Sequence, residues 1–258
     1  MLKEFNEEVQ KTDEQLNSTN VAELLSKDDL EKIGLDVVEG YDYDKLSRAE
    51  WEVRYEQALK LAAQVMERKT FPWPGAANIK YPLLTMACLQ FSSRSYPVLV
   101  PPVEAVKCRA VGYDEDGEKS KRAERISKHM SYQVLEQMTD WEEHMDRLLV
   151  MIPITGTEFK KTYFDPANGS NVSCHVMAKD LVVNYWAKSL ETAIRKTHVL
   201  YMTKNDVRER ILRGIFLEED LGEPDTRTDS VNQTSDNIQG ITDIDQKSRP
   251  YTILEQHC

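Results

Sequence analysis

The stretch TEFKKTYFDPANGSNVSCHV, residues 157–176, decides the fold class. Apolar and polar residues alternate over 157–164 and again over 172–176, which is the two-residue period of a β-strand. The polar connection between these runs contains Asn168-Gly169, a dipeptide typical of tight hairpin turns. The sequence therefore predicts an antiparallel hairpin that turns at Asn168-Gly169.

Apolar residues follow a helical period in the chain before this hairpin, which predicts helices at 44–69, 79–94, 118–138 and 140–151. The first helix must end before Phe71-Pro-Trp-Pro-Gly75, because proline removes a backbone donor and restricts the residue before it. After the hairpin, a further strand at 197–202 and a helix closed by Gly214 are expected. The predicted fold class is α+β, with long amphipathic helices and a small antiparallel sheet.

Composition divides the chain into four parts. Residues 1–43 predict an acidic, solvated N-terminal arm, and 44–223 predict the main α+β domain. Residues 224–249 are rich in Asp, Ser, Thr, Gln and Asn, which favours a polar loop or a disordered insertion. Residues 250–258 regain alternation and predict the start of a strand that is cut short.

The net charge of −11 over 258 residues argues against a general polyanion binder, because binding to phosphates needs clustered Lys and Arg. The charge is uneven: residues 1–70 hold ten Lys and Arg against seventeen Asp and Glu, whereas 71–112 hold four against one. The densest basic cluster is Lys121, Arg122 and Arg125, near Lys119. Two interpretations of it stay open: a solvated helix face balanced by nearby acids, or a contact for DNA or capsid protein.

The sequence gives little support for a membrane protein, a disulfide-linked protein or an enzyme. No apolar stretch approaches the roughly 20 residues of a membrane span, so no membrane association is expected. The four cysteines show no CxxC spacing, which favours reduced thiols in a cytoplasmic compartment. Nucleotide-binding, hydrolase and zinc motifs are absent, so no catalytic, cofactor-binding or metal-ligating set is predicted and the protein is not expected to be an enzyme.

The segment FPWPGAANIKYPL, residues 71–83, carries a resemblance. It resembles the "PWPGASN…yPLl…A…F…R…P" stretch in portal proteins of tailed bacteriophages, of the large podovirus type. Similar segments follow in the same order over roughly Ala49 to His257: WEVRYEQAL (51–59), DWEEHMDRLL (140–149), TEFKKTYF (157–164), HVLYMTKNDV (198–207), GIF (214–216) and YTILEQH (251–257).

This resemblance implies a structural subunit with a portal wing-like fold. Such portals form a homo-oligomeric ring, usually of twelve copies, at one capsid vertex, and the ring is the conduit for DNA packaging and ejection and the head–tail junction. The implied partners are other copies, capsid protein, a terminase, a head–tail adaptor and double-stranded DNA that passes without specific binding. The implied location is the virion, and the host cytoplasm during assembly. Family members are longer, so the resemblance implies that this is the N-terminal, wing-side part, with stem, clip and crown beyond Cys258.

Five aromatic residues are candidates for core or subunit packing. We expect Phe71, Trp73 and Tyr81 to be buried against the helices that carry Trp51 and Trp141, although an exposed surface that contacts a neighbouring subunit is the alternative.

Two other functions stay open. One is a metal-dependent nuclease or other phosphoryl-transfer enzyme, which would need converging carboxylates from Asp114, Asp116, Asp140 and Asp165. These acids fall in turns and caps, where Asp is common for structural reasons. The other is a protein-binding adaptor that forms no ring.

Overall fold

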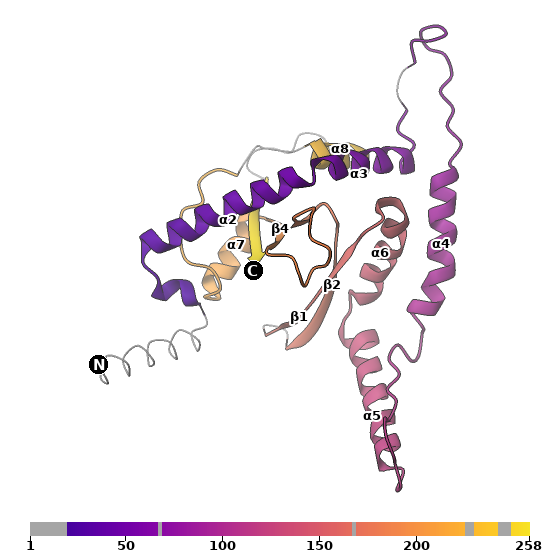
Figure 1. The fold of residues 1–258 in the computed structure, drawn as a ribbon, viewed down its shortest axis with the longest axis vertical. Coiled ribbons are helices and arrows are strands. Elements are labelled where there is room, and N and C mark those ends of the chain that lie inside the picture. Colours follow the sequence, from indigo (N-terminus) through magenta and orange to yellow (C-terminus); the bar gives the residue numbers. More distant parts are fainter. Residues whose placement is uncertain (1–19, 67–68, 167–168, 225–229, 242–248) are drawn as a thin grey trace. The chain divides into compact units, whose positions relative to one another are not determined.

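A computed structural model describes residues 20–66, 69–166, 169–224, 230–241 and 249–258. Helices and two small antiparallel sheets make up this part of the chain, which confirms the α+β class (Figure 1). The chain divides into two compact units. Unit 1 joins the described residues up to Glu50 with Asp180–Cys258, and unit 2 is Trp51–Lys179.

Unit 2 consists mainly of helices. It contains most of α3 (Ala49–Ala62), α4 (Leu83–Leu99), α5 (Glu118–Tyr132), the π-helical turn η2 (Gln133–Gln137) and α6 (Trp141–Thr155). Helix α6 packs against both α4 and strand β2 (Ser170–Val176). Each of these elements contributes a buried apolar residue: Cys88 of α4, Leu149 of α6 and Val176 of β2.

The predicted hairpin is confirmed. Strand β1 (Phe159–Asp165) pairs antiparallel with β2, from Phe159 opposite Val176 to Asp165 opposite Ser170. Gly169 has a positive φ of 63°, a conformation that glycine adopts without steric cost. The other residue of the predicted turn, Asn168, lies outside the described residues.

Unit 1 is built around a three-stranded antiparallel sheet with the order β3-β4-β5. Its strands are β3 (Leu181–Val183), β4 (Lys196–Met202) and β5 (Tyr251–His257), and the last agrees with the strand expected after residue 250. The short helix η1 (Val21–Leu24), α2 (Lys27–Ser47), α7 (Lys204–Leu212) and α8 (Ser230–Gln239) complete the unit. Val182 and Thr197 are fully buried at the sheet.

Polar contacts attach the end of α2 to this sheet region. The Asp44 side chain is 1% exposed and accepts two hydrogen bonds from Arg195, at 3.0 Å from Nε and 3.1 Å from Nη2. Asn184 donates a third, from Nδ2 at 3.0 Å. Gly40 lies one turn earlier, and a Cβ there would come within 2.9 Å of Arg195 Nε. The sequence of α2 therefore leaves room for the guanidinium that pairs with Asp44.

Helix α2 differs from the expected organisation. The proposed boundary between an acidic arm (1–43) and the main domain falls inside this helix, whose buried residues include Asp44 and Gly40. The helix expected over 44–69 is instead the end of α2 followed by α3, which stops at Ala62. Residues 1–19 of the expected arm lie outside the described residues.

Other helix bounds also shift. The helix expected over 79–94 is α4 at Leu83–Leu99, and the one expected over 140–151 is α6 at Trp141–Thr155. Each contains a proline near its end, which removes one backbone donor without stopping the last turn. The helix expected over 118–138 is α5 followed by η2. Within the expected polar loop over 224–249, residues 230–239 form α8, while 225–229 and 242–248 lie outside the described residues.

Candidate functional site

An extended loop connects α3 to α4 in unit 2; residues 69–82 are here named the aromatic loop. Figure 1 shows that it projects past the ends of both helices. Its end is closed by two backbone hydrogen bonds, from Gly75 to Lys69 at 3.3 Å and from Ala76 to Trp73 at 3.1 Å. At its base, Lys80 Nζ donates to the carbonyl oxygen of Val65 at 3.1 Å. The loop thus has local order but lies away from the packed helices.

The large side chains of the aromatic loop are exposed. The exposed fraction is 83% for Phe71, 63% for Trp73, 90% for Ile79 and 73% for Tyr81. The expectation that Phe71, Trp73 and Tyr81 lie in the core is therefore wrong. Helix α3 already ends at Ala62, and Gln64 just beyond it has a positive φ of 54°. Pro72 and Pro74 then prevent the following residues from resuming a helix, and the chain extends into solvent.

The two other aromatic candidates lie on helices of unit 2. The Trp51 ring contacts the Tyr55 ring in a tilted arrangement, with ring centroids 5.1 Å apart and an angle of 39° between their planes. The Trp141 ring lies 5.4 Å from Lys160 Nζ, in a cation–π contact. Both side chains are half-buried within their own unit. The structure does not bring them together with the aromatic loop.

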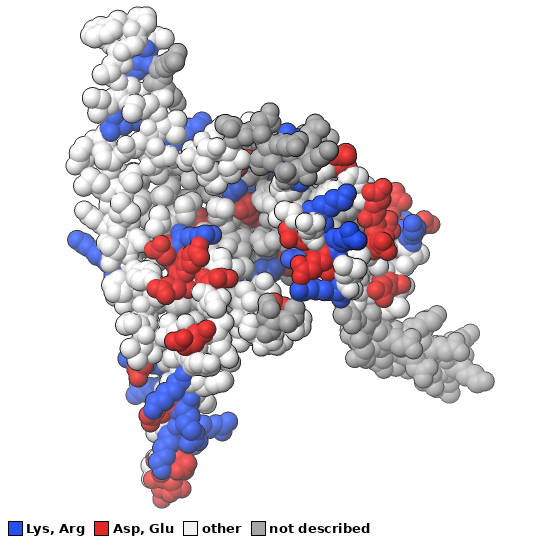
Figure 2. Space-filling model, turned by 180° about the vertical axis from the view of Figure 1, so that it is seen from behind, with Lys and Arg blue, Asp and Glu red and all other residues white. Residues whose placement is uncertain are grey.

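The aromatic loop is also nearly free of charge. Its charged residues are Lys69 and Lys80, and it contains no Asp or Glu. In Figure 2 its surface is mostly white. Exposed apolar side chains gathered in one segment typically mark a surface that another molecule covers. This loop is therefore the strongest candidate for an interaction site in unit 2.

A second candidate surface is the outer face of α5, here named the basic face: Lys121, Arg122 and Arg125. All three side chains are exposed, and Figure 2 shows Lys and Arg gathered over this helix. The helix holds five Lys and Arg against two Glu. Its opposite face is packed, because Ser127 Oγ accepts from Cys108 N at 2.6 Å and Ser131 Oγ accepts from Val106 N at 3.1 Å.

Ion pairs balance only part of the charge on α5. Lys121 lies 2.9 Å from Glu118, and Lys128 lies 2.8 Å from Glu124. Among the described residues, Arg122 and Arg125 have no carboxylate within ion-pair distance. The helix thus presents uncompensated positive charge on its solvent side, which suits an anionic surface.

The acidic residues considered for metal-dependent chemistry have other roles. The Asp114 carboxylate accepts hydrogen bonds at the start of α5 from Lys119 N at 3.1 Å, Ser120 N at 2.9 Å and Ser120 Oγ at 2.7 Å. These bonds, above all that from the Ser120 hydroxyl, lower the pKa of Asp114. Asp116 lies in the preceding turn, Asp140 precedes α6 and Asp165 ends β1. In the described part of the chain, no three His, Cys, Asp or Glu side chains gather as metal ligands would.

Sequence reasoning missed a buried polar cluster beside the hairpin. The Glu158 carboxylate is fully buried and lies 2.8 Å from His175 Nε2. It also accepts from Thr155 Oγ1 at 2.9 Å and from the backbone nitrogen of Ala178 at 3.2 Å. Three partners satisfy this carboxylate, so the cluster joins the end of α6 to β2. No local signal reveals the pair, because only the β1–β2 register brings together residues 17 positions apart.

His144 of α6 lies near this cluster, and its Nδ1 is buried without a hydrogen-bond partner among the described residues. Burial lowers the pKa of His144, and the charges at Arg147, His175 and Lys160 lower it further, while Asp140 acts in the opposite direction. The neutral imidazole is therefore the form that the folded state favours.

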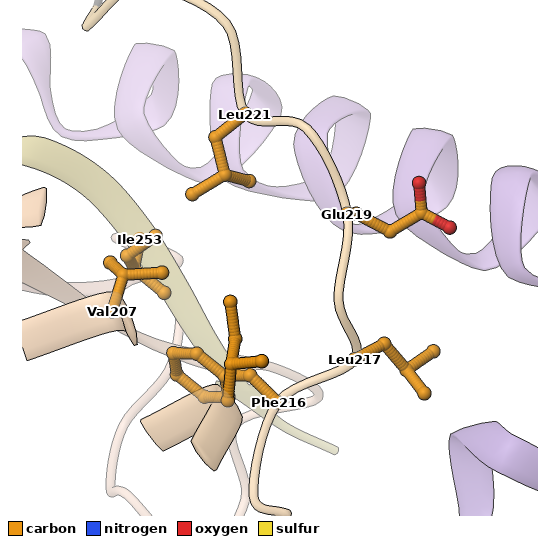
Figure 3. Close-up of a pocket in the computed structure, with 7 residues that line it drawn as sticks. Val207, Phe216, Leu217, Glu219, Leu221 and Ile253 are labelled. Atoms are coloured by element: carbon orange, nitrogen blue, oxygen red, sulfur yellow. The ribbon is translucent and has the colours of Figure 1, made fainter. Parts of the chain in front are cut away.

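Unit 1 contains a small apolar pocket of about 200 Å³ (Figure 3). It is lined by Val207 and Ile211 of α7, Ile253 of β5, and Phe216, Leu217, Glu219 and Leu221 of the segment after α7. Figure 3 shows Val207, Phe216, Leu221 and Ile253 facing a common space, while the Glu219 carboxylate points away from it. The Arg210 guanidinium supports one wall, because it lies 5.6 Å from the Phe216 ring centroid. No local sequence pattern reveals this pocket, because its lining comes from three separate elements.

Comparison of the sequence with protein-family models and with curated proteins finds no match. Among the described helices, none combines the length and the apolar character that a membrane span requires.

Proposed function

We propose that this chain is the wing-side part of a bacteriophage portal ring, a structural subunit of the DNA conduit at one capsid vertex. The observation that carries the proposal is the exposure of the aromatic loop. This segment carries the portal resemblance together with the segments that follow it, and Phe71, Trp73 and Tyr81 are each more than 60% exposed. A single chain leaves them in water, and a neighbouring copy in a ring would cover them.

The basic face of α5 gives the proposal a second, weaker support. A ring through which DNA passes must contact the DNA, or anionic surfaces near the ring, without binding the DNA tightly. Exposed positive charge at Lys121, Arg122 and Arg125, within a chain of net charge −11, is compatible with weak contacts that depend on salt. The same face would equally serve a contact with capsid protein.

Assembly tests the proposed function directly. We expect the purified chain to form ring-shaped particles with a central channel in negative-stain images, and a mass well above 29.8 kDa by light scattering. A monomer at every concentration would contradict the ring and favour the adaptor without a ring. Hydrolysis of plasmid DNA that requires a divalent metal would instead favour the nuclease.

A further inference from the structure

The pocket of unit 1 has the size and chemistry to hold one aromatic side chain. An apolar cavity of about 150 Å³ binds benzene, so a pocket of about 200 Å³ can take a phenyl or indole ring. Apart from Glu219, whose carboxylate points away, its lining side chains are apolar. The pocket is open to solvent through Leu221, which is 45% exposed.

We propose that this pocket receives the aromatic loop of a neighbouring copy of the chain, with one side chain of the loop end, either Phe71 or Trp73, inserted into it. The inference rests on the proposed ring and names the two surfaces that would join its subunits. Phe71 and Trp73 lie in the loop end that the Lys69–Gly75 hydrogen bond closes, and both are largely exposed. Large aromatic residues seated in a pocket are the usual centre of a protein interface.

Charge complementarity favours this occupant. The segment 217–223, which forms one side of the pocket, contains Glu218, Glu219, Asp220 and Glu223 and no Lys or Arg. The aromatic loop has the opposite character, with Lys69 and Lys80 and no acid. The two surfaces would therefore combine an apolar centre with a rim of opposite charges, which orients partners and speeds their encounter.

The geometry of such a contact explains assembly into a ring. The loop and the pocket are different surfaces, so each copy would offer one to each neighbour. This is a heterologous interface, which forms a closed ring when the rotation between copies closes. A self-complementary patch would instead stop at a dimer.

The test uses the full chain in two forms. The loop variant carries Phe71→Ala and Trp73→Ala, and its control is Trp186→Ala, a tryptophan that is 85% exposed in unit 1. The pocket variant is Leu221→Asp, and its control is Leu212→Asp, a leucine that is 78% exposed and does not line the pocket. Leu221 is 45% exposed and the other substituted residues are at least 63% exposed, so we expect melting temperatures close to that of the unmodified chain. Assembly is measured by light scattering and negative-stain imaging.

We expect the loop variant and the pocket variant each to be monomeric, while both controls assemble as the unmodified chain does. Mixing the two variants is the decisive measurement, because one intact loop and one intact pocket remain. The mixture should form only a one-to-one dimer, of twice the 29.8 kDa chain mass. A mixture that stays monomeric would overturn the pairing and leave the pocket to another partner. Rings formed by either variant alone would overturn the pairing but not the ring, and failure of the unmodified chain to assemble would overturn both proposals.

Discussion

The contact between Asp44 and Arg195 gives a quantitative test of the fold, through the substitution Asp44→Ala. The Asp44 side chain is 1% exposed and holds three hydrogen bonds, two from Arg195 and one from Asn184. Removing one partner of a buried ion pair costs about 3–5 kcal/mol, because the remaining charge loses its compensation without regaining full hydration. Arg195 is 29% exposed and can recover some water, so we expect a loss near the lower limit, about 3 kcal/mol.

Urea unfolding followed by circular dichroism measures this loss, and Asp42→Ala is the matched control. Asp42 lies on the same helix but is exposed, so both substitutions gain the same helix propensity and differ only in the buried contact. We expect Asp42→Ala to change the free energy of unfolding by no more than about 0.5 kcal/mol. In the double variant Asp44→Ala, Arg195→Ala, part of the loss should be recovered, because no unpaired charge remains. Equal effects of Asp44→Ala and Asp42→Ala would refute the docking of α2 described above.

Three further predictions concern unit 2. Trp73→Ala should lower the free energy of unfolding by less than about 1 kcal/mol in chemical denaturation, because this side chain is exposed; a loss of about 3–5 kcal/mol would show that it is buried. Fluorescence anisotropy at physiological salt should give a Kd for duplex DNA no tighter than about 10⁻⁴ to 10⁻⁶ M, and reversing the charge of Lys121, Arg122 and Arg125 should weaken it; nanomolar, sequence-dependent binding would argue against a conduit. Because the pKa of His144 is lowered on folding, its neutral form contributes stability above about pH 6.5 that is lost as the pH falls. The substitution His144→Gln should flatten this dependence of the free energy of unfolding on pH. An unchanged pH profile would show that His144 does not titrate as described.

The spacing of the hydrophobic residues along the sequence was enough to predict the fold class and the hairpin. The alternation over 157–176 corresponds to β1 and β2, and the helical spacing after Glu118 corresponds to α5. The docking of α2 could not be predicted in this way, because its contacts use Asp44 and the carbonyl-binding Arg48 rather than apolar residues. Helix α8 was missed for a related reason: its buried face includes Ser235 beside Val231.

The sequence singled out the aromatic loop as a candidate site. It did not predict whether the side chains of this loop are buried or exposed. Prolines at 72 and 74 indicated a break after α3. The local sequence does not determine whether the chain then packs against the helices or extends into solvent. Because aromatic residues are commonly buried, the sequence favoured a core position for Trp73, which is exposed. The pocket of unit 1 depends on residues from 207 to 253, whose proximity arises only from tertiary packing.

The discontinuity of unit 1 has a consequence for the order in which the chain folds during synthesis. Helix α2 leaves the ribosome long before its partner Arg195, which is 151 residues beyond Asp44. At about 5–20 residues per second, the helix waits roughly 8–30 s for that partner. Unit 2 is complete at Lys179, before any strand of the unit 1 sheet is made. We therefore expect nascent chains arrested once Lys179 has left the ribosomal exit tunnel, and before β5 is made, to protect unit 2 from protease while α2 is still cleaved.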